Sequence, residues 1–105
     1  MIARVWSGSA RVGHARQYLD HLEQHTIPGL TGIDGYRGAY VLRRDRPDGL
    51  EQFLVVTLWD SLDAIRRFAG ADVEAAVVPA EAQAHLATYE DRAAHYEVMI
   101  APVAS

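Results

Sequence analysis

The sequence predicts an α+β fold in which a four-stranded antiparallel sheet carries its helices on one face. Segments with the composition of strands and segments with helical periodicity follow one another in the order β-α-β-β-α-β, the split βαβ arrangement. Residues 52–68 pass directly from a strand into a helix. The chain has 105 residues, 50% of them hydrophobic, which suffices for one core, so residues 1–105 are expected to form a single domain.

The first two elements are a strand and an amphipathic helix. Residues 2–7 alternate in side-chain direction, which places Arg4 and Trp6 on one face of a strand. A helix is expected at residues 12–24, where apolar side chains recur at helical spacing, namely Ala15, Tyr18, Leu19 and Leu22. Pro28 and Gly29 predict the end of this helix.

The middle of the chain predicts two strands and then a second helix. The strands are expected at residues 38–44 and 53–59, joined by a breaker-rich turn at residues 45–49. The second of these strands is a run of apolar or β-branched residues, which is typical of a strand buried on both faces. Asp60 and Ser61 follow directly and are favourable N-caps for the helix.

Short helices and one more strand are expected after Gly70. The spacing of Val73, Ala76 and Val77 predicts one helical segment. A second is predicted at residues 79–86, with Pro79 in its first turn. The final strand is expected at residues 94–100, and in this topology it lies beside the first strand.

Composition excludes several classes of function. The net charge is -4 and basic residues form no cluster, so nucleic acid is not an expected partner. A membrane is not expected either, because no apolar run is long enough and the start lacks a leader-like segment, so we expect a cytoplasmic protein. The absence of cysteine excludes thiol catalysis, and the absence of lysine excludes Schiff-base chemistry.

No cofactor or metal is expected from the motifs. Glycines occur singly at turns, without a phosphate-binding or dinucleotide-binding pattern. His21 and His25 have the spacing of two metal ligands on a helix, but no third ligand follows nearby. A solvated helix face is the preferred interpretation of this pair.

The chain resembles the antibiotic biosynthesis monooxygenase family of dimeric α+β barrels. The resemblance is carried by segments spread over the chain: MIARVW, IDGYRGAYVLRR, FLVVTLWDSLDAIRRFAG, VVPAEA and AHYEV. It implies a ferredoxin-like fold and a pocket between sheet and helices that contains a tryptophan, which Trp59 matches. Members of the family include cofactor-independent oxygenases of aromatic polyketides and quinols, and haem-degrading enzymes.

Two departures from the family affect these functions differently. Val55 stands where the polyketide oxygenases have an asparagine. Trp6 stands where the haem-degrading enzymes have an asparagine, and no histidine occurs at residues 77–79, where those enzymes have their axial ligand. His85, expected on a helix that points toward the pocket, is the remaining candidate for such a ligand. The haem interpretation is therefore weakened more than the oxygenase interpretation.

The sheet face away from the helices is expected to be apolar and to need a cover. Residues on both faces of the predicted strands are largely hydrophobic. An exposed apolar sheet face usually marks an interface. We therefore expect a homodimer joined sheet to sheet.

Three aromatic residues are candidates for substrate binding. Trp6 and Trp59 would lie on neighbouring strands and form the walls of a flat slot for an aromatic ring, unless they are ordinary core residues. Tyr40, on the second strand, is a candidate for hydrogen bonding to a ligand carbonyl, with a core tyrosine as the alternative.

Three ionisable residues are candidates for catalysis. Arg4 and Glu97 are expected to pair across the first and last strands with His95 beside them, because an unpaired buried charge is costly. In the catalytic interpretation His95 is a general base, Glu97 orients its ring and Arg4 holds a substrate oxyanion. The alternative is a salt bridge at the dimer interface.

The preferred function is a small, cofactor-independent, monooxygenase-like enzyme that acts on an aromatic molecule of the polyketide or quinol type. A non-catalytic dimer that binds an aromatic metabolite is the first alternative. A haem-binding or haem-degrading protein and a redox-free isomerase or cyclase are the others.

Overall fold

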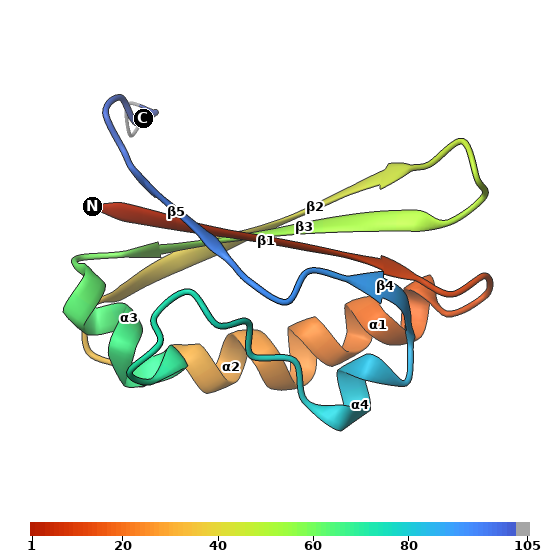
Figure 1. Cartoon of the computed structure of the whole chain (residues 1–105), viewed down its shortest axis with the longest axis horizontal. Helices are drawn as coiled ribbons and strands as arrows, with labels where there is room; N and C mark the ends of the chain where they lie inside the picture. Colours follow the sequence, from red (N-terminus) through yellow and green to blue (C-terminus); the bar gives the residue numbers. More distant parts are fainter. Residues whose placement is uncertain (103–105) are drawn as a thin grey trace.

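The computed structural model describes residues 1–102 and shows helices packed on one face of a sheet (Figure 1). The elements in chain order are β1 (Ile2–Ala10), α1 (Ala15–His21), the π-helical turn η1 (Leu22–Thr26), α2 (Ile27–Leu30), β2 (Tyr36–Asp45), β3 (Glu51–Trp59), α3 (Leu62–Ala69), α4 (Ala80–Gln83), β4 (Leu86–Tyr89) and β5 (Ala94–Glu97). All the strand pairs are antiparallel. The predicted α+β class is confirmed.

The sheet has five strands where four were predicted. The additional strand is β4, which lies along the same edge of β1 as β5. The strand order is β2-β3-β1-β4, and β5 also pairs with β1. β5 pairs with the first half of β1, from Ile2 to Val5, and β4 with the second half, from Gly8 to Ala10. The two short strands therefore lie end to end beside β1, and the sheet stays four positions wide.

The first helix is longer than predicted. α1, η1 and α2 follow one another without a break along the sheet (Figure 1). The N–H of Ile27 reaches back to the carbonyl of Leu22 in a π-type bond, and Pro28 then lies in the first turn of α2, where its missing N–H is tolerated. The predicted stop at Pro28 and Gly29 is therefore wrong.

The junction of β3 and α3 agrees with the prediction. The Ser61 hydroxyl accepts a hydrogen bond of 3.1 Å from the N–H of Ala64 and caps the helix. Ala64 and Ile65 are buried against Trp59 and Leu30 in one apolar cluster. This packing fixes α3 at one end of the sheet.

Residues 71–79, here called the strap, are irregular rather than helical. The N–H of Ala76 donates to Asp91 and the N–H of Ala93 donates to Glu74, at 2.9 and 2.8 Å. These bonds to a distant part of the chain replace the local bonds of the predicted helix around Val73. The strap leads to α4, whose N-cap is Pro79.

The last predicted elements end differently. Leu86, expected in a helix, begins β4 instead. β5 stops at Glu97, earlier than the predicted residue 100. The part of the chain that the structure describes contains no helix both long and apolar enough to cross a membrane.

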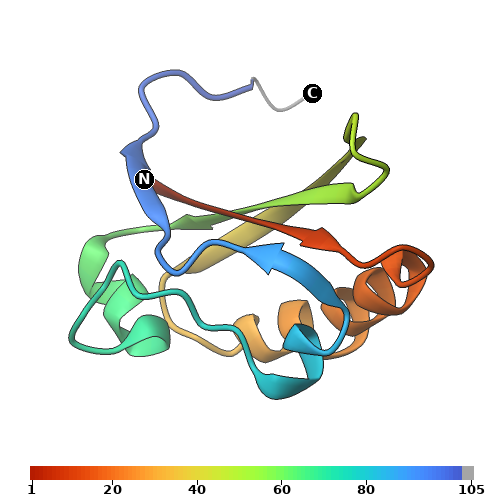
Figure 2. The same ribbon diagram turned by 45° about the vertical axis from the view of Figure 1, so that its right-hand side comes forward.

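The helices leave one face of the sheet uncovered (Figure 2). The register aligns Val5, Val56 and Tyr40 across three strands, and Leu54 beside Leu42. Tyr40 is 55% exposed and Leu42 is 49% exposed. We call this surface the open sheet face.

Candidate functional site

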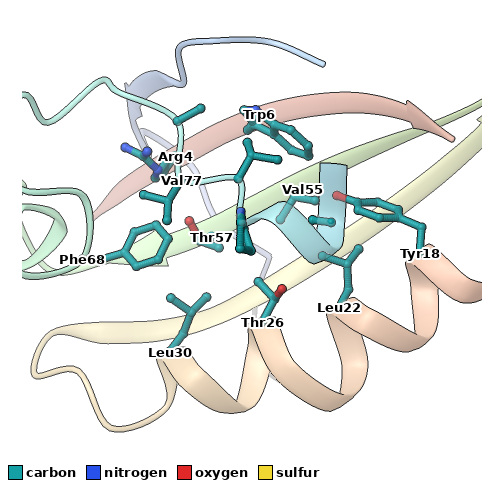
Figure 3. Close-up of a pocket in the computed structure, with 14 residues that line it drawn as sticks. Arg4, Trp6, Tyr18, Leu22, Thr26, Leu30, Val55, Thr57, Phe68 and Val77 are labelled. Carbon is teal, nitrogen blue, oxygen red and sulfur yellow. The ribbon is translucent and has the colours of Figure 1, made fainter. Parts of the chain in front are cut away.

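A cavity of about 70 Å³ lies between the sheet and the helices (Figure 3). Its lining residues are Arg4, Trp6, Tyr18, Leu22, Thr26, Leu30, Val55, Thr57, Phe68, Ala76, Val77, Val78, Pro79 and Ala82. This volume is well below the roughly 300–1,000 Å³ typical of pockets for small molecules. The wall is mainly apolar, with hydroxyl groups and one guanidinium among its described residues.

Arg4 is the charged group of this wall and is 5% exposed. Its Nη1 donates to the carbonyl of Val73 at 2.6 Å, and its Nη2 donates to the carbonyl of Ala75 at 2.7 Å. Its Cζ lies 5.6 Å from the centre of the Phe68 ring. Burial lowers the pKa of Arg4, but a guanidinium keeps its proton in proteins. The cavity therefore contains a buried positive charge.

His95 lies behind Arg4 and does not line the cavity. The two residues are directly opposite in the β1–β5 register, and Arg4 Nη1 lies 2.8 Å from His95 Nε2. Because a guanidinium only donates, this network assigns Nε2 as the acceptor and places the ring proton on Nδ1. Burial, and then the charge of Arg4, lower the pKa of His95, while Glu74 opposes them. His95 is thus neutral at neutral pH.

The predicted Arg4–Glu97 ion pair is wrong. Glu97 is exposed and lies opposite Ile2 in the β1–β5 register, two residue pairs beyond His95 and on the same face of the sheet. The donors of Arg4 are directed instead at strap carbonyls, which are closer and are already oriented by the strap. A buried cation is here satisfied without a carboxylate.

The two tryptophans do not form a common slot. Both lie on the helix side of the sheet, but the antiparallel register pairs Trp6 with Val55 and Trp59 with Ile2, so the Arg4–Thr57 pair separates them. Trp6 lines the cavity. Trp59 is 0% exposed and lies in the core, stacked on Phe68 at 6.0 Å between ring centres. The expected place of Trp59 in the wall of the pocket is therefore wrong.

Three hydroxyl groups line the cavity that the sequence analysis did not single out, those of Tyr18, Thr26 and Thr57. Thr57 Oγ1 accepts a hydrogen bond of 2.8 Å from Trp59 Nε1, so its own proton is free to point elsewhere. Burial raises the pKa of Tyr18, which stays protonated at neutral pH. Figure 3 shows Tyr18 at the opposite end of the cavity from Arg4 and Phe68. The signal for Thr57 was present, because it is a polar residue within an apolar strand.

Tyr40 and His85 are placed away from the cavity. Tyr40 belongs to the open sheet face. The bulge in β2 between Tyr36 and Gly38 shifts the alternation of side chains, so Tyr36 packs against the core instead. His85 lies at the end of α4, with its Nδ1 3.1 Å from His14 Nδ1. The predicted orientation of His85 toward the pocket is wrong.

Comparisons with known proteins agree with this architecture. The model of the family described as "Antibiotic biosynthesis monooxygenase" matches residues 1–80. No curated protein matches the chain significantly.

Several solved structures have the same fold. The heme-degrader MhuD from Mycobacterium tuberculosis, with two hemes in its active site, is 18% identical with a TM-score of 0.68, over 98% of this chain and 100% of that one. A protein classed as an antibiotic biosynthesis monooxygenase from Bacillus cereus is 17% identical with a TM-score of 0.66, over 98% and 97%. Another so classed, from Deinococcus radiodurans, is 20% identical with a TM-score of 0.60, over 100% and 99%. At these identities the likeness shows the fold alone. The family match covers most of the sequence, and the chain belongs to the antibiotic biosynthesis monooxygenase family.

Proposed function

We propose that the protein is a small, cofactor-independent, monooxygenase-like enzyme that binds an aromatic molecule as its oxygen anion beside Arg4. The observation that carries this proposal is a buried guanidinium in the wall of an otherwise apolar cavity. Such a group stabilises negative charge strongly, because little water screens it there. Membership of the family supports the class of reaction.

Binding an aromatic ring system requires the cavity to enlarge, and the strap is the part that moves. A volume of about 70 Å³ is well below the roughly 300–1,000 Å³ of pockets that hold such ligands. Residues Ala76, Val77 and Val78 of the strap form one wall, and Arg4 holds the strap through the carbonyls of Val73 and Ala75. The ligand oxygen replaces these carbonyls as the acceptor and becomes an anion when the substrate loses its proton, so binding releases the strap.

The reaction proposed needs a base and dioxygen. His95 does not line the closed cavity, so this step requires the same release of the strap. Once Arg4 has turned toward the ligand, Nε2 of His95 loses its donor and becomes free to accept a proton from an acidic C–H of the substrate. The resulting carbanion is an enolate whose oxygen lies at Arg4. It gives its electron pair to dioxygen, forming a C–O bond and, after protonation, a hydroperoxide. The hydroperoxide then loses water, which takes the second hydrogen of the same carbon and leaves a carbonyl. Overall, a CH₂ group and O₂ give C=O and H₂O.

Anthrone, an aromatic ketone with an acidic CH₂ group, is a suitable probe. Binding should quench the fluorescence of Trp6, which lines the cavity, and the W6F variant should lose this response while W59F retains it. An oxygen electrode should record one O₂ consumed for each quinone formed. H95Q should lower turnover by roughly 100-fold at neutral pH, as the loss of a general base does.

The other functions give different results in the same assay. Quenching without O₂ uptake and without product indicates a binding protein. Product without O₂ uptake indicates an isomerase or cyclase. No quenching by anthrone or a quinol contradicts the proposed ligand class.

Haem fits the cavity poorly. None of the described residues that line it is a histidine, and His85 faces a different hollow. A titration with haemin tests this directly. A shifted Soret band that survives H85Q would contradict our assignment and support a haem protein.

We also propose that residues 1–105 act as one domain, in the cytoplasm, as a homodimer joined through the open sheet face. The apolar row of Val5, Val56 and Tyr40 supports the dimer. The absence of cysteine supports a reducing compartment.

A further inference from the structure

Four of the five histidines lie in or next to a second hollow, which is separate from the cavity. A hollow of about 500 Å³ is lined by Gln17, Asp20, His21, Gln24, His25, Glu81 and His85. His14 lies next to it and contacts His85, with 3.1 Å between their Nδ1 atoms. The hollow shares no lining residue with the cavity, so it is a separate feature.

Two different parts of the chain supply this cluster. His21 and His25 come from the long helix, and their ring centres are 5.6 Å apart. Glu81 and His85 come from α4 and the residues after it, which pack beside α1 (Figure 1). The backbone of His85 is fixed, because its carbonyl accepts a hydrogen bond of 2.9 Å from the N–H of Arg11. The two sides of the hollow are thus held in place by the fold.

His21 is the unusual member of the cluster. Its side chain lines the hollow but the residue is only 8% exposed, and its Nε2 is buried without a hydrogen-bond partner among the described residues. A buried nitrogen without a partner is unfavourable and rare. An imidazole nitrogen that lacks a hydrogen-bond partner is available to bind a metal ion.

We propose that this hollow binds a divalent transition-metal ion such as Zn²⁺, with His21 and His25 as its ligand pair and Glu81 or His85 as the third ligand. Imidazole and carboxylate together suit Zn²⁺ and Ni²⁺, whereas Mg²⁺ requires oxygen ligands. In the described residues no three such side chains surround a common point, so the site is half formed. The third side chain rotates inward on binding, and water fills the remaining positions.

Calorimetry on the full, tag-free chain tests the site with zinc chloride. One Zn²⁺ should bind per chain and raise the melting temperature, because the ion joins the long helix to α4. H25Q changes an exposed residue and should still fold, and E81Q and H85Q test the opposite side. Changes to residues that only hydrogen-bond to the metal ligands weaken metal binding by about 10–100-fold. Loss of a direct ligand should therefore lower the affinity for Zn²⁺ at least tenfold.

Two controls separate this site from adventitious binding. H95Q removes the histidine that lies outside the cluster and should bind Zn²⁺ like the wild type. Mg²⁺ should produce neither heat nor a thermal shift. Binding that depends on His25 but is indifferent to both E81Q and H85Q would indicate a surface histidine only and overturn the proposal. The absence of a thermal shift in excess Zn²⁺ would overturn it as well.

A nuclear magnetic resonance measurement covers the buried ligand, for which a variant may not fold. Zn²⁺ should shift the ¹⁵N resonance of a ring nitrogen of His21 in the wild type. An unchanged resonance at saturating Zn²⁺ would remove His21 from the site and overturn the proposed ligand pair.

Discussion

Arg4 joins three distant parts of the chain to the cavity wall. It belongs to β1, it donates to two carbonyls of the strap, and it lies against His95 of β5. Each of these contacts is buried or partly buried, so water competes with it little. The same residue therefore stabilises the closed strap and supplies the positive charge proposed to bind the ligand.

Replacement of Arg4 by glutamine should lower the free energy of unfolding. The carbonyls of Val73 and Ala75 lose their partners, and a buried acceptor left without one costs about 1–3 kcal/mol. Urea denaturation measures the change. R37Q is the matched control, because Arg37 forms an exposed ion pair with Asp60, and such pairs contribute little. If R4Q were as stable as R37Q, Arg4 would not hold the strap.

The pH dependence of stability should reveal the environment of His95. Burial and the charge of Arg4 lower its pKa in the folded chain from the ordinary 6.5. The unfolded chain therefore binds this proton at higher pH than the folded chain does. Hence the free energy of unfolding decreases as the pH falls through 6.5 and levels off below the pKa of the folded state.

H95Q should flatten this dependence without abolishing it. Urea denaturation at about pH 7.5 and pH 5.5 gives the two slopes. His21 has a lowered pKa as well and should account for the remaining slope. The pKa values of Asp60 and Asp72 are also lowered, but these residues affect stability only in a separate pH range, below the ordinary 3.8. Equal slopes for H95Q and the wild type would contradict the neutral state assigned to His95.

Among the elements, the turn before β2 depends on the packing of α3. Gly35 has a φ of 92°, and its carbonyl accepts a hydrogen bond of 2.9 Å from the N–H of Asp60. A Cβ atom at Gly35 would lie 2.5 Å from the Cβ of Ala64, the first buried residue of α3. Only glycine lets the turn and the helix approach this closely.

G35A should therefore be more destabilising than G49A. Gly49 has a φ of 87° and open space around it, so G49A measures the backbone term alone, about 1–2 kcal/mol. Overpacking against Ala64 should add about 1–3 kcal/mol in G35A. Thermal unfolding of both variants gives the difference. Equal melting temperatures would show that α3 moves to accept the methyl group.

Elements with strong local signals were predictable, and those set by distant pairing were not. β3 and α3 follow from an apolar run and the Ser61 cap, both encoded within a few residues. β4 was missed because it is short and its hydrogen bonds are with β1, which is distant in sequence. The helical spacing of the residues before it extended the predicted helix into β4. The strap was predicted as helix because the spacing of Val73 and Ala76 carries no information on their distant partners.

The candidate site shows the same limit. Arg4 and Trp6 were placed correctly on one face of β1, because alternation along a strand is local. The common slot of Trp6 and Trp59 was not predicted correctly, since the distance between them depends on the register between β1 and β3. The bond from Arg4 to the strap carbonyls was also beyond prediction, because backbone acceptors leave no mark in the sequence.

For the whole molecule, the uncovered sheet face is the surface on which the proposed dimer depends. Val56 is central on the open sheet face, with Val5 on one side and Tyr40 on the other. A monomer would expose this row to water, and continuous apolar surface of this kind favours association. Closing two such faces together would bury both rows in a C2 interface, where the same patch meets itself.

V56K should convert the proposed dimer into a monomer. Lysine at this position places a charge in the centre of the apolar row, twice in a symmetric interface, and an unpaired buried charge is strongly unfavourable. Light scattering during gel filtration should give the mass of two chains for the wild type and of one for V56K. Circular dichroism should stay unchanged, because the side chain points away from the helices. E23K, on the exposed side of the long helix, should remain dimeric. A monomeric wild type, or a dimeric V56K, would show that the open sheet face is not the interface.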